Sequence, residues 1–136
     1  MANQLYAKGK QAILCGSCNW LGTASTSPAV VLCASEYALD IVAHDYLADI
    51  TAAHRVASAI LVNTSASDGV ADADDVVFSA LTGSNVFDVV VFNWTGADAT
   101  SRLIAHIDTG GSLPYTPNGA DLTLTFSSGA CKVFAL

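Results

Sequence analysis

The sequence predicts a mainly β fold: an antiparallel β-sandwich or barrel-like domain with a short N-terminal helix and a short connecting helix. Two observations predict it. Short apolar segments rich in β-branched residues recur along the chain, and clusters of Gly, Asn, Pro and Ser separate them. No long helical pattern intervenes, which argues against a parallel α/β sheet. With 136 residues, the chain forms a single domain over 1–136, in which residues 1–28 make a helix and loop arm that we expect to contribute to a docking surface.

The N-terminal helix is predicted over residues 2–14. Leu5, Ala12 and Ile13 recur at helical spacing, and Lys8 lies on the opposite side of the helix. Residues 22–28 combine Gly, Ser, Thr and Pro, which interrupt regular structure. We therefore expect a loop after the helix.

Residues 29–34 form a continuous apolar run of strand length, bounded by turn signals. Such a run is typical of a strand that is buried on both faces, in the interior of a sheet. Further on, Tyr46, Leu47 and Ile50 have the spacing of one helical turn, and Asp45 is placed to cap it. We expect the short connecting helix at this point.

From residue 55 onward, strand patterns follow one another. Asp68 and Gly69 give a strong signal for a tight turn. In residues 121–126, Leu and Phe alternate with Thr, which places one face of that strand toward the core and the other toward water. The later strands are predicted at 56–62, 76–81, 86–94, 103–108, 122–126 and 131–136.

Composition and charge argue against several classes of protein. Hydrophobic residues make up 52% of the chain and charged residues only 12%, so we expect part of the surface to be covered by a partner. A net charge of −7 with five basic residues argues against a nucleic-acid partner, because phosphate binding needs clustered Lys and Arg. No apolar run approaches the roughly 18–20 residues of a membrane-spanning helix. The segment after Lys8 and Lys10 is too short for a signal peptide, so we expect synthesis in the cytoplasm and no membrane partner.

Cys15 and Cys18 are separated by two residues, a spacing that suits two ligands of one Zn²⁺ or one redox disulfide. Cys33 and Cys131 have no neighbouring partner in sequence, and a redox dithiol would need a βαβ context that this sequence lacks. We expect Cys15 and Cys18 to be bystander thiols, with a local disulfide and a metal site as the less frequent alternatives. Cys33 and Cys131 are expected to pack in the core or at a strand edge.

Carboxylates and histidines are the other candidates for chemistry. Residues 72–75 hold three aspartates, but the rest of a calcium loop is missing, so an acidic, solvated turn is the stronger interpretation. His44, His54 and His106 can act as general bases, yet no catalytic motif accompanies them. We interpret them as surface or packing residues, with His106 on a polar strand face. The sequence thus predicts no enzyme, no cofactor and no metal site.

Large aromatic side chains are the candidate interface residues, because they supply contact area at low entropy cost. Such residues form interface or sugar-stacking platforms, although core packing is their more common role. Trp94 and Tyr115 are expected nearest the surface, since Trp94 ends an apolar strand and prolines flank Tyr115. The candidate interface residues are Tyr6, Trp20, Trp94 and Tyr115.

Six segments carry a further pattern of strands and turns: LYAKGK (5–10), YLADI (46–50), RVA (55–57), DGVADADDV (68–76), LIAHID (103–108) and PNGADLTLTF (117–126). Together they resemble a family of small phage virion proteins known as head decoration or cement proteins. The similarity is one of strand and turn patterns and includes no catalytic fingerprint.

The resemblance implies a structural virion protein that binds the outer surface of a phage capsid and stabilises contacts between major capsid subunits. It implies the major capsid protein as partner, a homo-oligomer (dimer or trimer), and a location on the capsid exterior after synthesis in the host cytoplasm. The alternative is a phage tail or receptor-binding adhesin component, which the aromatic residues favour. A third reading, a small metal or redox enzyme that uses Cys15 and Cys18, lacks a complete site.

Overall fold

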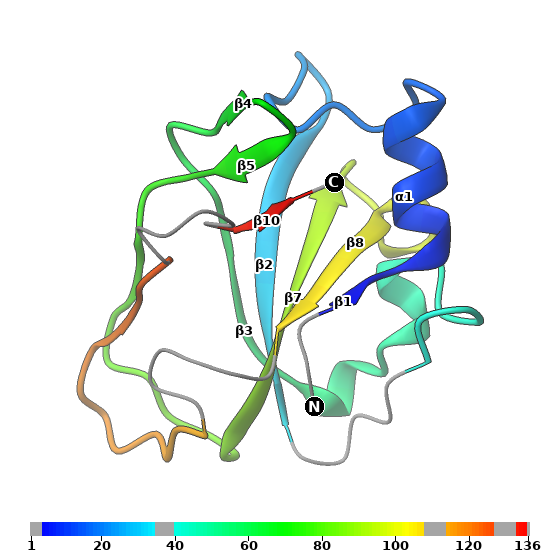
Figure 1. The fold of residues 1–136 in the computed structure, drawn as a ribbon. Coiled ribbons are helices and arrows are strands. Elements are labelled where there is room, and N and C mark those ends of the chain that lie inside the picture. Colours follow the sequence, from blue (N-terminus) through cyan, green and yellow to red (C-terminus); the bar gives the residue numbers. More distant parts are fainter. Residues whose placement is uncertain (1–3, 35–39, 108–113, 127–132, 136) are drawn as a thin grey trace.

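The computed structural model describes residues 4–34, 40–107, 114–126 and 133–135, and strands dominate them (Figure 1). Three 3-10 helices and one α-helix connect the strands within this part of the chain. The elements are β1 (Gln4–Leu5), α1 (Ala7–Leu14), β2 (Ser27–Ala34), η1 (Leu47–Asp49), η2 (Ala52–His54), β3 (Arg55–Ile60), β4 (Ser65–Ser67), β5 (Val70–Asp72), β6 (Val76–Phe78), β7 (Val86–Trp94), η3 (Asp98–Thr100), β8 (Arg102–Ile107), β9 (Leu122–Leu124) and β10 (Phe134–Ala135).

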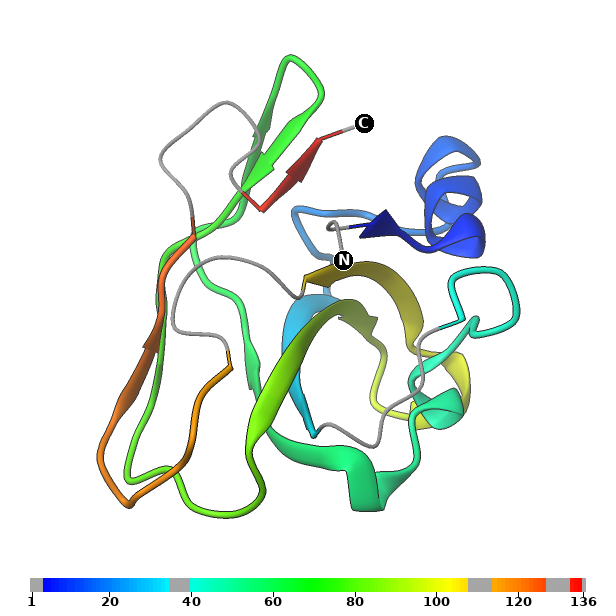
Figure 2. The same cartoon turned by 60° about the horizontal axis from the view of Figure 1, so that its bottom comes forward.

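The strands form three antiparallel sheets. The largest has the order β1-β8-β7-β2-β3, the second has the order β10-β5-β4, and the third consists of β6 and β9. Figures 1 and 2 show the two smaller sheets beside the large one, α1 next to its β1–β8 edge, and the η1–η2 segment near the opposite end of that helix. The prediction of a mainly β, antiparallel fold is confirmed. The arrangement is sandwich-like, and the described strands do not close into a barrel.

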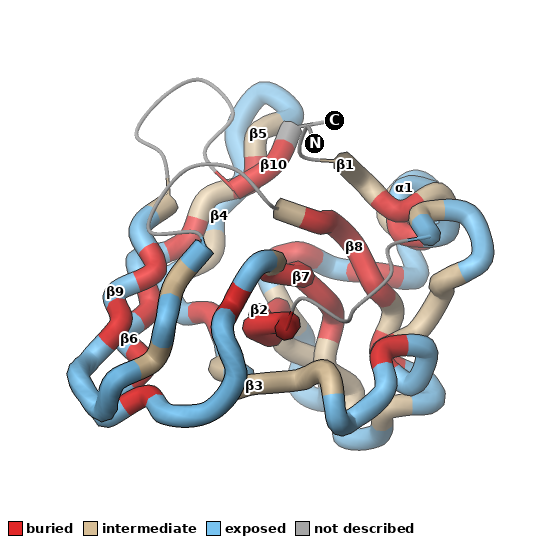
Figure 3. The backbone as a smooth tube through the Cα atoms, turned by 90° about the horizontal axis from the view of Figure 1, so that it is seen from below, coloured by how far each residue is buried: buried red, intermediate tan, exposed pale blue. Residues whose placement is uncertain are grey.

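Two hydrophobic clusters cover the two faces of the large sheet. The first lies between that sheet and the smaller sheets, and it includes Val30, Val91 and Phe78. The second lies on the opposite face, below η1, and includes Val31 and Phe92. Because β2 contributes to both clusters, all its residues after the first are buried, as the apolar run predicted. Figure 3 shows this buried strand inside the sheet, with the half-exposed β3 along the outer edge.

Helix α1 begins at Ala7 instead of residue 2. Gln4 and Leu5 pair with β8, and the N–H of Tyr6 donates to the carbonyl of Ile104 at 2.9 Å, so the preceding residues extend the sheet. The helical pattern is therefore confirmed only for its second part. Among the described helices, none has the length and apolar content needed to cross a membrane.

The connecting helix is present as η1, but its cap differs from the prediction. The side chain of Asp49 accepts hydrogen bonds from the N–H groups of Asp45 and Tyr46, at 2.8 and 3.0 Å. Asp49 therefore caps the segment and Asp45 does not. A second turn, η2, follows at once and leads into β3.

The turn at Asp68 and Gly69 is confirmed, because both residues adopt positive φ values, +52° and +80°, between β4 and β5. Such a pair suits the type I′ turn of a two-residue hairpin. The two strands of this hairpin were not predicted, since their Ser, Ala and Asp residues lack an apolar alternation. The loop predicted at 22–28 ends earlier, because β2 already begins at Ser27. Cys131 lies outside the described residues.

Candidate interaction surfaces

A groove runs along the second face of the large sheet beside β3. It has a volume of about 420 Å³, and its floor includes Ala29 and Val31 of β2 together with Phe92 of β7. Trp94 and Asp98 line its other side. We call this feature the edge groove. The remaining lining residues are Leu47, Arg55, Val56, Ala57, Ser58, Ala59 and Ile60.

The charged groups of the edge groove are already engaged within the chain. Arg55 donates from Nε to the carbonyl of Ile50 at 2.8 Å, from Nη2 to the carbonyl of Leu47 at 2.7 Å, and from Nη1 to Asp98 at 2.7 Å. The guanidinium therefore fixes η1 and η3 to the start of β3. Three of its five N–H groups are thus used within the chain, and the groove offers mainly apolar surface and the backbone of β3 to a partner.

The outer edge of β3 carries unpaired backbone groups. Antiparallel strands alternate between hydrogen-bonded and non-hydrogen-bonded residue pairs. The N–H of Leu61 donates to Pro28 at 2.9 Å, and Ala59 lies opposite Val30, so these positions face β2. The N–H and C=O groups of Ser58 and Ile60 consequently point away from β2, and no described residue bonds to them.

A second surface surrounds α1. Its exposed apolar residues are Leu14, Leu21 and Val42, whose side chains are 80%, 60% and 69% exposed. The N–H of Ala7 donates to the carbonyl of Ile41 at 2.9 Å, which holds the turn with Val42 beside the start of the helix. We call Leu14, Leu21 and Val42 the arm surface.

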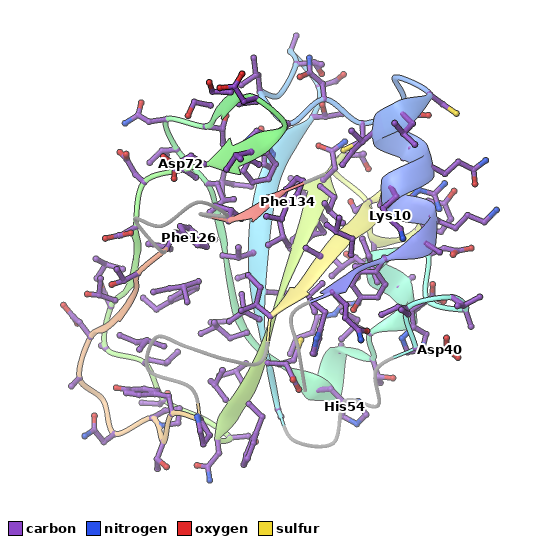
Figure 4. The ribbon with its side chains drawn as sticks, viewed as in Figure 1. Lys10, Asp40, His54, Asp72, Phe126 and Phe134 are labelled. Carbon is purple, nitrogen blue, oxygen red and sulfur yellow. The ribbon has the colours of Figure 1, made fainter. Side chains whose placement is uncertain are left out.

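The same side of this acidic protein carries most of its basic residues. Lys8, Lys10 and Arg102 are three of the five Lys and Arg residues of the chain. Arg102 stacks over the ring of Tyr46 at 4.1 Å and donates to its hydroxyl at 2.8 Å. Figure 4 labels Lys10 on α1. A polar cavity of about 280 Å³ lies next to the helix and is lined by Lys8, Gln11, Ala12, Cys15, Ser17, Asp45, Tyr46 and Arg102.

The four candidate interface residues divide into two groups. Tyr6 is fully buried and Trp20 is only 8% exposed, so in this structure these two side chains offer a partner almost no surface. Tyr6 fills the second cluster, and the Trp20 indole anchors the β4–β5 hairpin. Trp94 and Tyr115 are half-buried: Trp94 lines the edge groove, and Tyr115 exchanges backbone hydrogen bonds with Val86.

The cysteines do not form a redox or metal site in the described residues. Cys15 is exposed and Cys18 is buried, and both are free thiols. Burial raises the pKa of Cys18, and the nearby Arg102 only partly opposes this shift. Burial, with a smaller effect of Asp88, raises the pKa of Cys33 to about 12, so this thiol stays protonated and unreactive at neutral pH.

The side chain of His106 is on the face of β8 that packs against the second hydrophobic cluster. The prediction that it lies on a polar strand face is therefore wrong. Its Nε2 lies 2.9 Å from a carboxylate oxygen of Asp88 on the neighbouring strand β7, and its side chain is buried. Asp88 stands opposite Cys33 in the β2–β7 register. Because the Cys33 thiol is protonated, these three neighbouring residues tie strands together and provide no nucleophile.

The acidic residues at 72–75 take part in local structure. Asp74 accepts a hydrogen bond from the side-chain amide of Asn63 at 2.6 Å, and Asp75 accepts from the N–H of Phe126 at 3.0 Å. Within the described ranges, no three His, Cys, Asp or Glu side chains converge as metal ligands.

Asp49 supports the wall of the edge groove, and its effect should depend on pH. The N–H groups of Tyr46 and then Asp45 lower the pKa of its carboxyl below the ordinary value of 3.8. As pH falls, the Asp49 carboxylate takes up a proton more readily in the unfolded chain than in the folded one. The stabilisation by the Asp49 charge is therefore complete above the ordinary carboxyl pKa and is lost as pH falls below it. Asp49→Ala should therefore lower the free energy of unfolding by about 1 kcal/mol near neutral pH.

Urea denaturation at about pH 6 and about pH 2 measures this dependence. The difference between wild type and Asp49→Ala should shrink in the acid. Asp68→Asn, which removes a carboxylate from the β4–β5 turn, is the matched control and should show a smaller difference. A difference for Asp49→Ala that stays constant over this range would contradict the role of its charge.

The edge groove was not predicted as a site, although β3 was. The strand pattern of β3 does not show which strands lie beside it in the sheet. Only the absence of charge over residues 56–62 could have indicated that this strand edge is an interaction site. No protein-family model matches the chain, and a comparison with curated proteins found no significant match. The function is therefore argued from the two surfaces.

Proposed function

We propose that this chain is a non-enzymatic structural protein of a phage virion, which binds the outer surface of the capsid and stabilises contacts between major capsid subunits. The observation that supports the proposal is the arm surface. Leu14, Leu21 and Val42 leave large apolar side chains in water. Leu14 ends α1, Leu21 follows in the next loop and Val42 lies beside the start of the helix. Large apolar side chains exposed around one element are typical of a protein interaction site.

The charge around the arm surface also suits this role. Lys8 and Lys10 lie on α1, and Arg102 lines the polar cavity next to this helix, although the whole chain has a net charge of −7. An acidic patch on the capsid subunit would complement this arrangement and orient the docking. The apolar residues would then supply most of the affinity, since a buried Leu contributes roughly 1.5–3 kcal/mol.

The tail or receptor-binding alternative is favoured by one observation. Trp94 lines an open groove together with the half-buried Asp98 and the exposed Ser58, and an aromatic face next to polar groups suits a sugar. Against it, Arg55 already uses all three of its nitrogens in hydrogen bonds within the chain, which leaves few polar groups to recognise hydroxyls. The capsid role is therefore preferred.

Cryo-electron microscopy of the virion tests the location. Many copies on the outer shell are expected, whereas density confined to the tail would favour the adhesin. Absence from the particle would contradict both.

A binding assay with shells that lack the protein tests the arm surface. The double variant Leu14→Ser, Leu21→Ser should bind at least about tenfold more weakly than wild type, because two exposed apolar contacts are lost. Val77→Ser removes another exposed apolar side chain, from β6, and is the control. Equal loss of binding in the control, or no loss in the double variant, would contradict docking through the arm.

A further inference from the structure

We propose that the outer edge of β3 pairs with β3 of a second copy of this chain. In this dimer the strands are antiparallel and a two-fold axis passes through Ala59. The two large sheets then become one continuous sheet. The inference goes beyond the proposed capsid contact, because it uses the opposite edge of the sheet from the β1–β8 edge that carries α1.

The backbone fits this pairing. About an axis at Ala59, Ser58 of one copy stands opposite Ile60 of the other, and the reverse. Both residues direct their N–H and C=O groups outward, so each opposite pair can exchange two main-chain hydrogen bonds. The two Ala59 residues form the intervening narrow pair, in which Cα atoms approach to about 4.5 Å, and their small side chains allow this approach.

The side chains are complementary to themselves about the same axis. Ser58 and Ile60 lie opposite Val31 and Ala29 of β2, so they share the face that forms the floor of the edge groove. Ile60 is 47% exposed. In the dimer, Ile60 of the second copy lies beside Ser58, at the open side of the groove. Each copy therefore contributes Ile60 to the partner's edge groove and receives the partner's Ile60 at its own.

The charge pattern favours a second copy as the occupant. Isolated edge strands usually carry Lys or Pro that prevents further pairing, yet residues 56–62 contain neither and carry no charge. Two chains with a net charge of −7 each repel one another, so they can meet only along an uncharged seam. Of the charges next to this stretch, Arg55 and Asp98 neutralise each other at 2.7 Å. Asp74 bonds through its N–H to the carbonyl of Val62 at 3.1 Å and accepts from Asn63 at 2.6 Å, so the proposed pairing ends before Val62.

Light scattering on the purified protein tests the dimer. Wild type should have the mass of two chains, and Ile60→Lys should weaken association at least tenfold, because it places a charge at the seam. Val77→Lys adds the same charge at an exposed position of β6 and should remain dimeric. Circular dichroism confirms that the variants are folded. If Ile60→Lys does not fold, Ser58→Lys at an exposed position of the same edge replaces it.

A second variant tests the register. Combining Ser58→Asp with Ile60→Lys should restore the dimer. With the two-fold axis at Ala59, the Asp of each copy faces the Lys of the other, so two pairs of opposite charges form between the strands. A dimer that Ile60→Lys leaves intact, a double variant that stays monomeric, or a monomeric wild type would overturn the proposed pairing.

The dimer and the capsid role can fail separately. A monomeric wild type that still binds shells would overturn the dimer alone. A dimer that ignores shells with vacant sites would overturn the capsid role alone. If both hold, each dimer carries two arm surfaces and links neighbouring capsid subunits, which raises the effective concentration of the second contact.

Discussion

Gly9→Ala should destabilise the protein by about 3 kcal/mol, even though the change usually stabilises a helix. A Cβ at position 9 would lie 2.5 Å from the carbonyl oxygen of Leu103 and 2.9 Å from the Cα of Ile104. Both contacts are with the backbone of β8, which is held between β1 and β7 and cannot move aside. The clash outweighs the gain of about 1 kcal/mol that Ala normally brings to a helix.

Urea denaturation of Gly9→Ala and wild type measures this effect, with Lys10→Ala as the control. Lys10 is exposed on the same helix, so its replacement should change the free energy of unfolding by less than about 0.5 kcal/mol. If Gly9→Ala is as stable as wild type, the helix is not packed against β8 as closely as described.

Strands with strong local patterns could be predicted from the sequence. Val86–Trp94 was predicted with the correct bounds, because its apolar run lies in the interior of the large sheet and turn residues flank it. The turn at Asp68 and Gly69 was also predicted, since few residue pairs tolerate two successive positive φ values. Short, exposed strands such as Ser65–Ser67 leave no such pattern.

Features that depend on long-range pairing could not be predicted. The position of β3 at a sheet edge follows from strand order, which the sequence of β3 alone does not contain. His106 was assigned to a polar face because its partner Asp88 lies 18 residues away, on a strand whose neighbour was unknown. The burial of Tyr6, a candidate interface residue, was not foreseen for a similar reason, since the second cluster that buries it is assembled from distant segments.

Trp20→Ala should cost about 3–5 kcal/mol of stability, the largest effect of any single change considered for this chain. The Trp20 ring packs edge-on against Phe134, with ring centroids 5.0 Å apart and an interplanar angle of 83°. Its Nε1–H lies 2.9 Å from the carbonyl of Ser65 and 3.2 Å from that of Asp72, and so holds both strands of the β4–β5 hairpin. Removing the indole therefore loosens the hairpin and its neighbour β10 from the first cluster.

Trp20→Phe separates the hydrogen bond from the packing. It keeps an aromatic ring against Phe134 but removes the N–H, so we expect a loss of about 1 kcal/mol. Urea denaturation gives both values, and hydrogen exchange should show faster opening of Val70–Asp72 in Trp20→Ala. A folded and equally stable Trp20→Ala that no longer binds shells would instead restore Trp20 to the interface. The burial of its side chain argues for the structural outcome, because a residue that is 8% exposed offers a partner almost no surface.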